Sequence, residues 1–186
     1  MSPIVETRIV TPEGFTSRDV ARFLWQMDEQ RRLTLDATRA LAPADLEWQH
    51  APGMNTIGML LAHVAFTEAN LAQVGLLGEP MGHPQDEIGI TDTDAGVPLP
   101  PGGRPPATLA GRPIAWFHDV LARARALTHR AARPLGDADL DVVIQRPPRP
   151  DGTVRRFDRA WVLYHLIEHE AGHRAQIQLL KHLRSV

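Results

Sequence analysis

Three histidines recur at four-residue intervals near the C-terminal end of the chain: His165, His169 and His173. Apolar residues around them follow a three- and four-residue spacing, which predicts one long α-helix with Asp158 as its N-terminal cap. Because four residues make slightly more than one helical turn, His169 and His173 lie on one face and are close enough to bind one metal ion. A straight helix cannot easily bring His165 onto the same ion, so we expect it beside the site, facing the substrate or packed in the core.

The same stretch contains a zinc-protease motif, His169-Glu170-x-x-His173, together with its inverted counterpart. A protease of the forward type needs a third ligand, usually downstream. The residues after His173 offer only His182, which is predicted to lie too far along the same helix. We therefore expect no peptidase activity, also because a helical bundle has no edge strand that could align a peptide. Glu170 is predicted to face solvent.

The upstream candidate for a third ligand is His63, which lies in an almost wholly apolar segment. A buried imidazole costs free energy unless both nitrogens are satisfied. His63 is therefore either a core histidine bonded to a backbone carbonyl or a metal ligand that completes the pair on the last helix. Three neutral imidazoles would leave a coordination position open, as in catalytic rather than structural sites. His118 and His129 are expected on helix surfaces, without a role.

The composition excludes several classes of protein. The chain has no cysteine, so disulfides, thiolate ligands and a cysteine nucleophile are absent, and any metal must use nitrogen or oxygen ligands. The net charge is −2, so the chain lacks the excess of positive charge that is typical of nucleic-acid-binding proteins. No segment has the pattern of a signal peptide or the length of a membrane span, so we expect a soluble cytoplasmic protein without nucleic-acid or membrane partners.

Helical periodicity predicts four helices of about twenty residues or more. They are expected over residues 16–41, 56–77, 113–132 and from 158 onward. A capping box, Thr16-x-x-Asp19, opens the first helix, Asn55 caps the second, and Pro113 suits the first turn of the third. Such helices predict an all-α fold, an antiparallel four-helix bundle with its site inside the bundle at one end.

The connections between the predicted helices differ in character. Residues 78–111 are rich in proline and glycine, which predicts a long crossover loop or surface flap. Residues 141–157 combine a β-branched run with prolines and a glycine, which permits a small hairpin or an extended lid. We found no internal repeat, and 186 residues suffice for one domain. We therefore expect residues 1–186 to form a single domain with the 78–111 loop as an insertion.

Three segments resemble signatures of the DinB/YfiT-like superfamily. Residues 55–63 are similar to its second-helix signature, residues 165–177 to its C-terminal signature, and residues 41–53 to the link between its first two helices. The resemblance implies a bundle of the mirror-image up-and-down type, commonly a homodimer, with a divalent metal ion held by His63, His169 and His173. Two features depart from the family: Ala175 replaces a usual glycine, and the proline-rich loop is unusually long.

The resemblance further implies that this chain is a thiol-dependent S-transferase or isomerase that uses mycothiol or bacillithiol. Our leading hypothesis is a divalent-metal-dependent transferase, with zinc or nickel favoured by imidazole ligands, that passes a low-molecular-weight thiol cosubstrate to a small-molecule electrophile. Proton transfer is assigned to His165, Glu168 and Tyr164. A metal-dependent hydrolase, a non-catalytic metal- or ligand-binding stress-response protein and a purely structural bundle are the alternatives.

Overall fold

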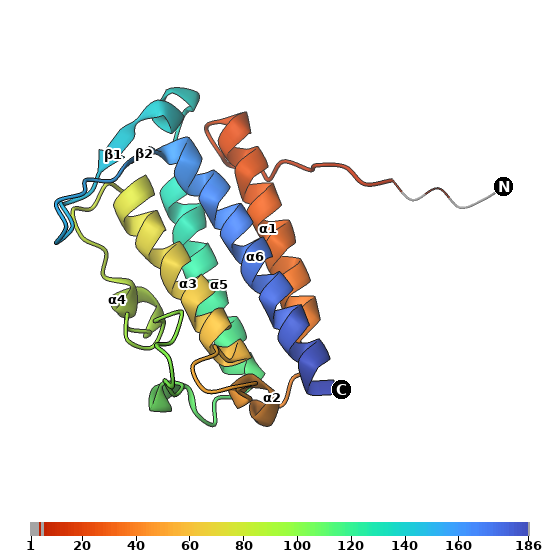
Figure 1. Ribbon diagram of the computed structural model, residues 1–186. Coiled ribbons are helices and arrows are strands. Elements are labelled where there is room, and N and C mark those ends of the chain that lie inside the picture. Colours follow the sequence, from red (N-terminus) through yellow and green to blue (C-terminus); the bar gives the residue numbers. More distant parts are fainter. Residues whose placement is uncertain (1–3, 5, 186) are drawn as a thin grey trace.

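The fold is mostly helical, as predicted. The computed structural model describes Ile4 and residues 6–185 (Figure 1). Four long helices lie side by side: α1 (Arg18–Thr38), α3 (Ile57–Leu71), α5 (Ile114–Ala132) and α6 (Arg159–Ser185). Among the described residues, no helix is both long enough and apolar enough to cross a bilayer.

The long helices do not alternate simply in direction. Helices α3 and α6 pack antiparallel, as the sequence led us to expect (Figure 1). Helices α3 and α5 also pack along each other, but they run in the same direction, as do α1 and α6. The reason is the long connection after α3, which returns along the length of the bundle before α5 begins. The crossover predicted at residues 78–111 therefore sets the topology.

The connections contain short elements. Helix α2 (Pro43–Glu47) precedes α3, and a π-helical turn (Ala72–Leu76) extends α3. The crossover contains helix α4 (Pro84–Ile88) and a 3-10 turn (Ala107–Leu109), and a second 3-10 turn (Asp137–Asp141) follows α5. Strands β1 (Val143–Gln145) and β2 (Arg156–Asp158) pair antiparallel, so a hairpin forms where the sequence permitted one.

Two of the predicted helix caps are displaced by one residue. Ser17, not Thr16, caps α1, because its side chain accepts backbone hydrogen bonds from the first turn. Thr56, not Asn55, caps α3, whereas the Asn55 side chain accepts a hydrogen bond from the crossover loop. Asp158 caps α6 as predicted, since its carboxylate accepts a bond of 2.7 Å from the backbone of the first turn. Neighbouring residues with similar side chains compete for the cap position, and packing decides between them.

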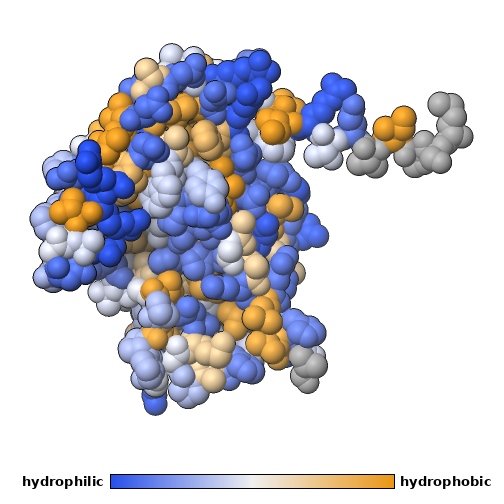
Figure 2. All heavy atoms as spheres, turned by 45° about the horizontal axis from the view of Figure 1, so that its top comes forward, coloured by the Kyte–Doolittle hydropathy of each residue, from blue (hydrophilic) through white to orange (hydrophobic). Residues whose placement is uncertain are grey.

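The core lies between the four long helices, and α3 is buried on more than one side. Its π-helical end comes very close to α6: a Cβ atom added at Gly75 would lie 2.8 Å from Cγ2 of Val162. This contact brings the end of α3, the start of α6 and the hairpin together at one end of the molecule. Hydrophilic side chains gather at that end, with hydrophobic ones scattered among them (Figure 2).

Candidate metal centre

Three histidines from two helices meet between α3 and α6. His63 lies on α3, and His169 and His173 lie one turn apart on α6; all three are partly buried. The Nε2 atom of His169 is 3.1 Å from Nε2 of His63 and 3.1 Å from Nε2 of His173. Imidazoles that bind one zinc ion tetrahedrally have nitrogens about 3.3 Å apart. The ligand atoms of the three residues, all within 4.8 Å of one another, therefore fit one metal ion. We call these residues the histidine cluster.

The outer nitrogens of two of these rings are held by hydrogen bonds. Nδ1 of His63 is 2.9 Å from the carbonyl oxygen of Ala95, and Nδ1 of His173 is 2.9 Å from Oε1 of Gln176. An oxygen acceptor requires the hydrogen on Nδ1, so Nε2 of each ring presents a bare lone pair to the cluster. Partners of this kind orient metal-binding histidines. The crossover loop, which carries Ala95, thus supports the site.

Burial keeps the cluster neutral. It lowers the pKa of His169 to about 3, with a further contribution from the neighbouring His173 and His63. Burial also lowers the pKa of His63 and of His173. At neutral pH all three imidazoles are uncharged, which is the form that binds a metal ion.

The three residues assigned to proton transfer also come together. Nδ1 of His165 is 2.9 Å from Oε1 of Glu168, and the hydroxyl group of Tyr164 donates a hydrogen bond of 2.8 Å to Oε2. The hydrogen bonds from His165 and Tyr164 lower the pKa of Glu168, and the same contact raises the pKa of Tyr164. The ring of His165 stacks on Trp161, with centroids 4.5 Å apart, and lies one turn before His169 on α6.

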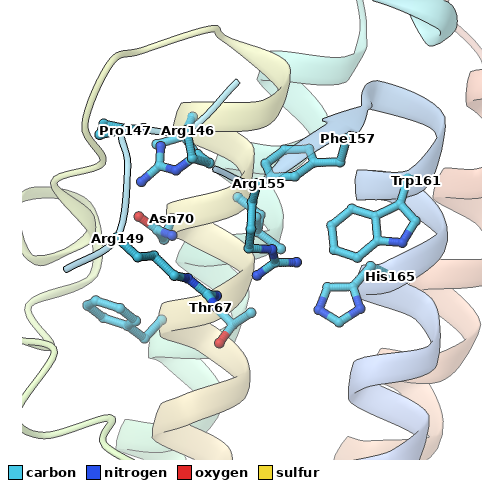
Figure 3. A pocket seen from close by; sticks show the side chains of 12 residues that line it. Thr67, Asn70, Arg146, Pro147, Arg149, Arg155, Phe157, Trp161 and His165 are labelled. Atoms are coloured by element: carbon cyan, nitrogen blue, oxygen red, sulfur yellow. The ribbon is translucent and has the colours of Figure 1, made fainter. Parts of the chain in front are cut away.

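A cavity of about 420 Å³ lies between α3, α6 and the hairpin, about one helical turn from the histidine cluster (Figure 3). His165 forms part of its wall on α6, one turn from His169. Phe66 and Thr67 line it on α3, about one turn from His63. The cavity and the cluster therefore share the same two helices, and His165 lies between them, with its ring centroid 5.6 Å from that of His169.

Glu170 does not face solvent, contrary to the sequence-based expectation. It is 2% exposed and lies in a network with Arg31, Glu68 and Arg125, which we call the buried ion network. One Glu170 oxygen is 2.9 Å from Nε of Arg31 and the other is 3.1 Å from Nη2 of Arg125. With both oxygens bound to arginine, Glu170 is not available as the base that the protease motif would require. The hairpin does supply short strands, so the case against a peptidase rests on Glu170 and the ligand set.

The sequence-based predictions did not include this network. The available signal was Glu68, a carboxylate within the largely apolar α3, which needs a cationic partner when buried. Burial alone would raise its pKa, but Arg125 and Arg31 lower it to about 2. His129, expected on a surface, is partly buried and contacts Asp28 beside the network, and His118 is bonded to Thr38. Neither histidine belongs to the cluster.

Comparisons with known proteins agree with the helical fold. The pattern of a family described as the DinB superfamily matches residues 26–177. The crystal structure of a conserved protein from Enterococcus faecalis resembles this chain with a TM-score of 0.62 and 18% sequence identity, covering 87% of this chain and 94% of that one. At this identity the likeness shows a shared fold and nothing about activity. No curated protein matches the chain.

Proposed function

This chain belongs to the DinB superfamily, whose members often bind metal ions, and we propose that it is a divalent-metal-dependent enzyme that transfers a low-molecular-weight thiol to an electrophilic small molecule. The observation that carries the proposal is the convergence of three Nε2 atoms, two with their lone pairs oriented, beside a cavity of small-molecule size. A buried histidine group without a ligand would leave these lone pairs facing one another.

In this proposal His63, His169 and His173 hold the ion, with zinc or nickel favoured by an all-imidazole set. When bound, the ion acts as a Lewis acid that lowers the pKa of a thiol, so that the thiolate forms near neutral pH. The chain has no cysteine, so the sulfur nucleophile must come from a cosubstrate. Three protein ligands leave room for that cosubstrate.

His165 is the group best placed to take the proton. Its Nδ1–H donates to Glu168, which leaves Nε2 to accept the proton that the thiol loses. The sulfur then forms a bond to the electrophilic carbon, the bond to the leaving group breaks, and the leaving group takes the proton back from His165. Glu168 orients the ring and stabilises its charged form, and Tyr164 holds Glu168 by donating to its second oxygen.

Cobalt substitution tests the metal and thiol parts of this proposal. Adding mycothiol, bacillithiol or 2-mercaptoethanol to the cobalt-loaded protein should produce a sulfur-to-metal charge-transfer band and release a proton. If no thiol changes the spectrum at millimolar concentration while esters or amides are hydrolysed, the protein is a hydrolase. If neither occurs, the result favours a non-catalytic binding protein.

Two variants test the proton-transfer part. His165→Ala and Glu168→Gln should keep the metal ion and the thiolate band, yet lower the rate of transfer by about a hundredfold or more for His165 and by less for the exposed Glu168. His182→Ala, on the same helix but outside the cluster, is the control and should leave both unchanged. A His165→Ala protein with full activity would remove His165 from the mechanism.

The homodimer that the resemblance implies also remains a proposal. Light scattering coupled to size-exclusion chromatography checks it directly, and a mass of 20.6 kDa in solution would contradict it.

A further inference from the structure

The cavity beside the histidine cluster is strongly basic. Three arginines of the hairpin region line it: Arg146, Arg149 and Arg155. The side chain of Arg149 ends beside Thr67, and that of Arg155 extends into the space between Thr67 and His165 (Figure 3). None of the residues described as lining the cavity is acidic. We call this cavity the arginine pocket.

The pocket arginines differ from the arginines of the buried ion network in their partners. Arg31 and Arg125 are each paired with carboxylates, whereas no ion pair involves Arg146, Arg149 or Arg155 within the described part of the chain. Arg155 instead lies over the ring of Trp161, 5.5 Å from its centroid. The nearby Asp151 is exposed and accepts hydrogen bonds from Thr153 rather than lining the pocket.

Backbone hydrogen bonds across the hairpin hold these arginines at the pocket. The backbone N–H of Arg146 donates to the carbonyl oxygen of Arg155 at 2.9 Å, and that of Arg149 donates to Thr153 at 2.9 Å. Three like charges around one concave space repel one another unless an anion occupies it. A guanidinium group matches the two oxygens of a carboxylate or phosphate with paired hydrogen bonds.

We propose that the arginine pocket binds the carboxylate or phosphate group of a substrate on which the histidine cluster acts. A volume of about 420 Å³ suits a small molecule. Arg149 and Arg155 bind the anionic group, Thr67 and Asn70 on α3 offer further polar contacts, and the reacting atom lies towards His165. This inference rests on the proposed function, because it names the class of substrate that the site would take.

Calorimetric titration with simple probes tests the pocket separately from turnover. Phenyl phosphate and benzoate should bind the metal-free protein as well as the metal-loaded one, while uncharged benzamide should not bind. Binding to the metal-free protein excludes direct coordination of the probe to the ion. Stronger binding of phenyl phosphate would identify a phosphate site, and stronger binding of benzoate a carboxylate site.

Matched arginine variants locate the binding. The Arg149→Gln and Arg155→Gln substitutions should each weaken anion binding about tenfold, because each removes a charge-assisted hydrogen bond. Arg156→Gln is the control, since Arg156 carries the same charge on the same hairpin but does not line the pocket. Unchanged circular dichroism establishes that each variant is folded.

Three results would contradict the proposed anion site. If the probes bind the double Arg149→Gln/Arg155→Gln variant as tightly as the parent protein, if benzamide binds equally well, or if no anion binds at millimolar concentration, the pocket is not an anion site. A retained cobalt–thiolate band in that case would leave the proposed function intact. Charge-dependent anion binding without any thiol chemistry would instead support the pocket and contradict the transferase.

A competition measurement assigns the anionic group to one of the two substrates. If bacillithiol, which carries carboxylate groups, gives the cobalt band and also displaces phenyl phosphate, the anionic group belongs to the thiol. If the thiol and phenyl phosphate bind together, it belongs to the electrophile. Either result supports an anion-binding role for Arg149 and Arg155.

Discussion

Two adjacent residues of α6 belong to different groups: Glu170 to the buried ion network and His169 to the histidine cluster. The two groups differ in how their polar atoms are hydrogen-bonded. In the network, both oxygens of Glu68 and of Glu170 have arginine partners, and Thr128 adds a bond to Glu68. In the cluster, the Nε2 atoms of three imidazoles face one another, and those of His63 and His173 carry no hydrogen. The network is therefore fully hydrogen-bonded within the protein, whereas the cluster has nitrogens that could hold a metal ion.

The histidine cluster and the buried ion network lie on different sides of α6, because successive helical residues are rotated by about 100°. His169 faces α3, where His63 lies, while Glu170 faces Arg31 of α1 and Arg125 of α5. One motif on the helix therefore supplies both a candidate metal ligand and a core ion pair. Metal content and stability should therefore respond separately to changes at these two adjacent residues.

The largest expected effect is the loss of metal from the cluster. Replacing His63, His169 or His173 by alanine should abolish binding or weaken it by about a hundredfold or more, since three ligands become two. The parent protein should hold about one ion per chain. Elemental analysis of the purified proteins measures the metal content of each. Undiminished metal in a folded His63→Ala protein would contradict the ligand set.

A change in the network should affect stability instead. Glu170→Gln leaves Glu68 as the only buried carboxylate shared by Arg31 and Arg125, and breaking a buried ion pair in this way costs about 3–5 kcal/mol. Urea denaturation of the metal-free proteins measures this, with His182→Ala as a control on the same helix. Folded Glu170→Gln protein should still bind one ion. Loss of metal with unchanged stability would show that Glu170 serves the cluster after all.

Acid should remove the stability that Glu68 gives to the buried ion network. The pKa of Glu68 falls from 4.5 to about 2 on folding, so Glu68 contributes stability that is complete above pH 4.5 and is lost as the pH falls towards 2. The groups that face it are Arg31, Arg125 and Thr128. Thermal denaturation of the metal-free protein should show this decline. A Glu68→Gln protein should be less stable at pH 7 and should lose less stability between pH 4.5 and 2. If both proteins lose stability equally over this range, the decline does not come from Glu68.

The smallest expected effect concerns a residue beside the cluster. Gln176→Ala removes the acceptor for Nδ1 of His173, and loss of such an orienting partner lowers metal affinity about tenfold. Competition with a chelator of known affinity measures the change. Gln178→Ala, an exposed position on the same helix, should have no effect. If both variants bind the ion equally, the hydrogen bond does not orient His173.

Much of the fold could be read from local patterns. Helical periodicity located all four long helices within a few residues, and the spacing of His169 and His173 placed both on one face of α6. The direction of α5 could not be predicted, because it depends on the path of the crossover. The arginine pocket was also missed, because nothing in residues 146–155 indicates that the hairpin folds over α3.

What the sequence determined by itself is what a single helix or turn determines: the period of each helix, the cap at Asp158 and the pairing of His169 with His173. Only the tertiary structure decided that His63 joins this pair from 106 residues away, and that Ala95 of the crossover bonds its outer nitrogen. It also decided that Glu170 is buried against arginines. The physical reason is that residues one turn apart keep the same neighbours in any helix, whereas contacts between helices depend on how each helix is rotated and packed against the others.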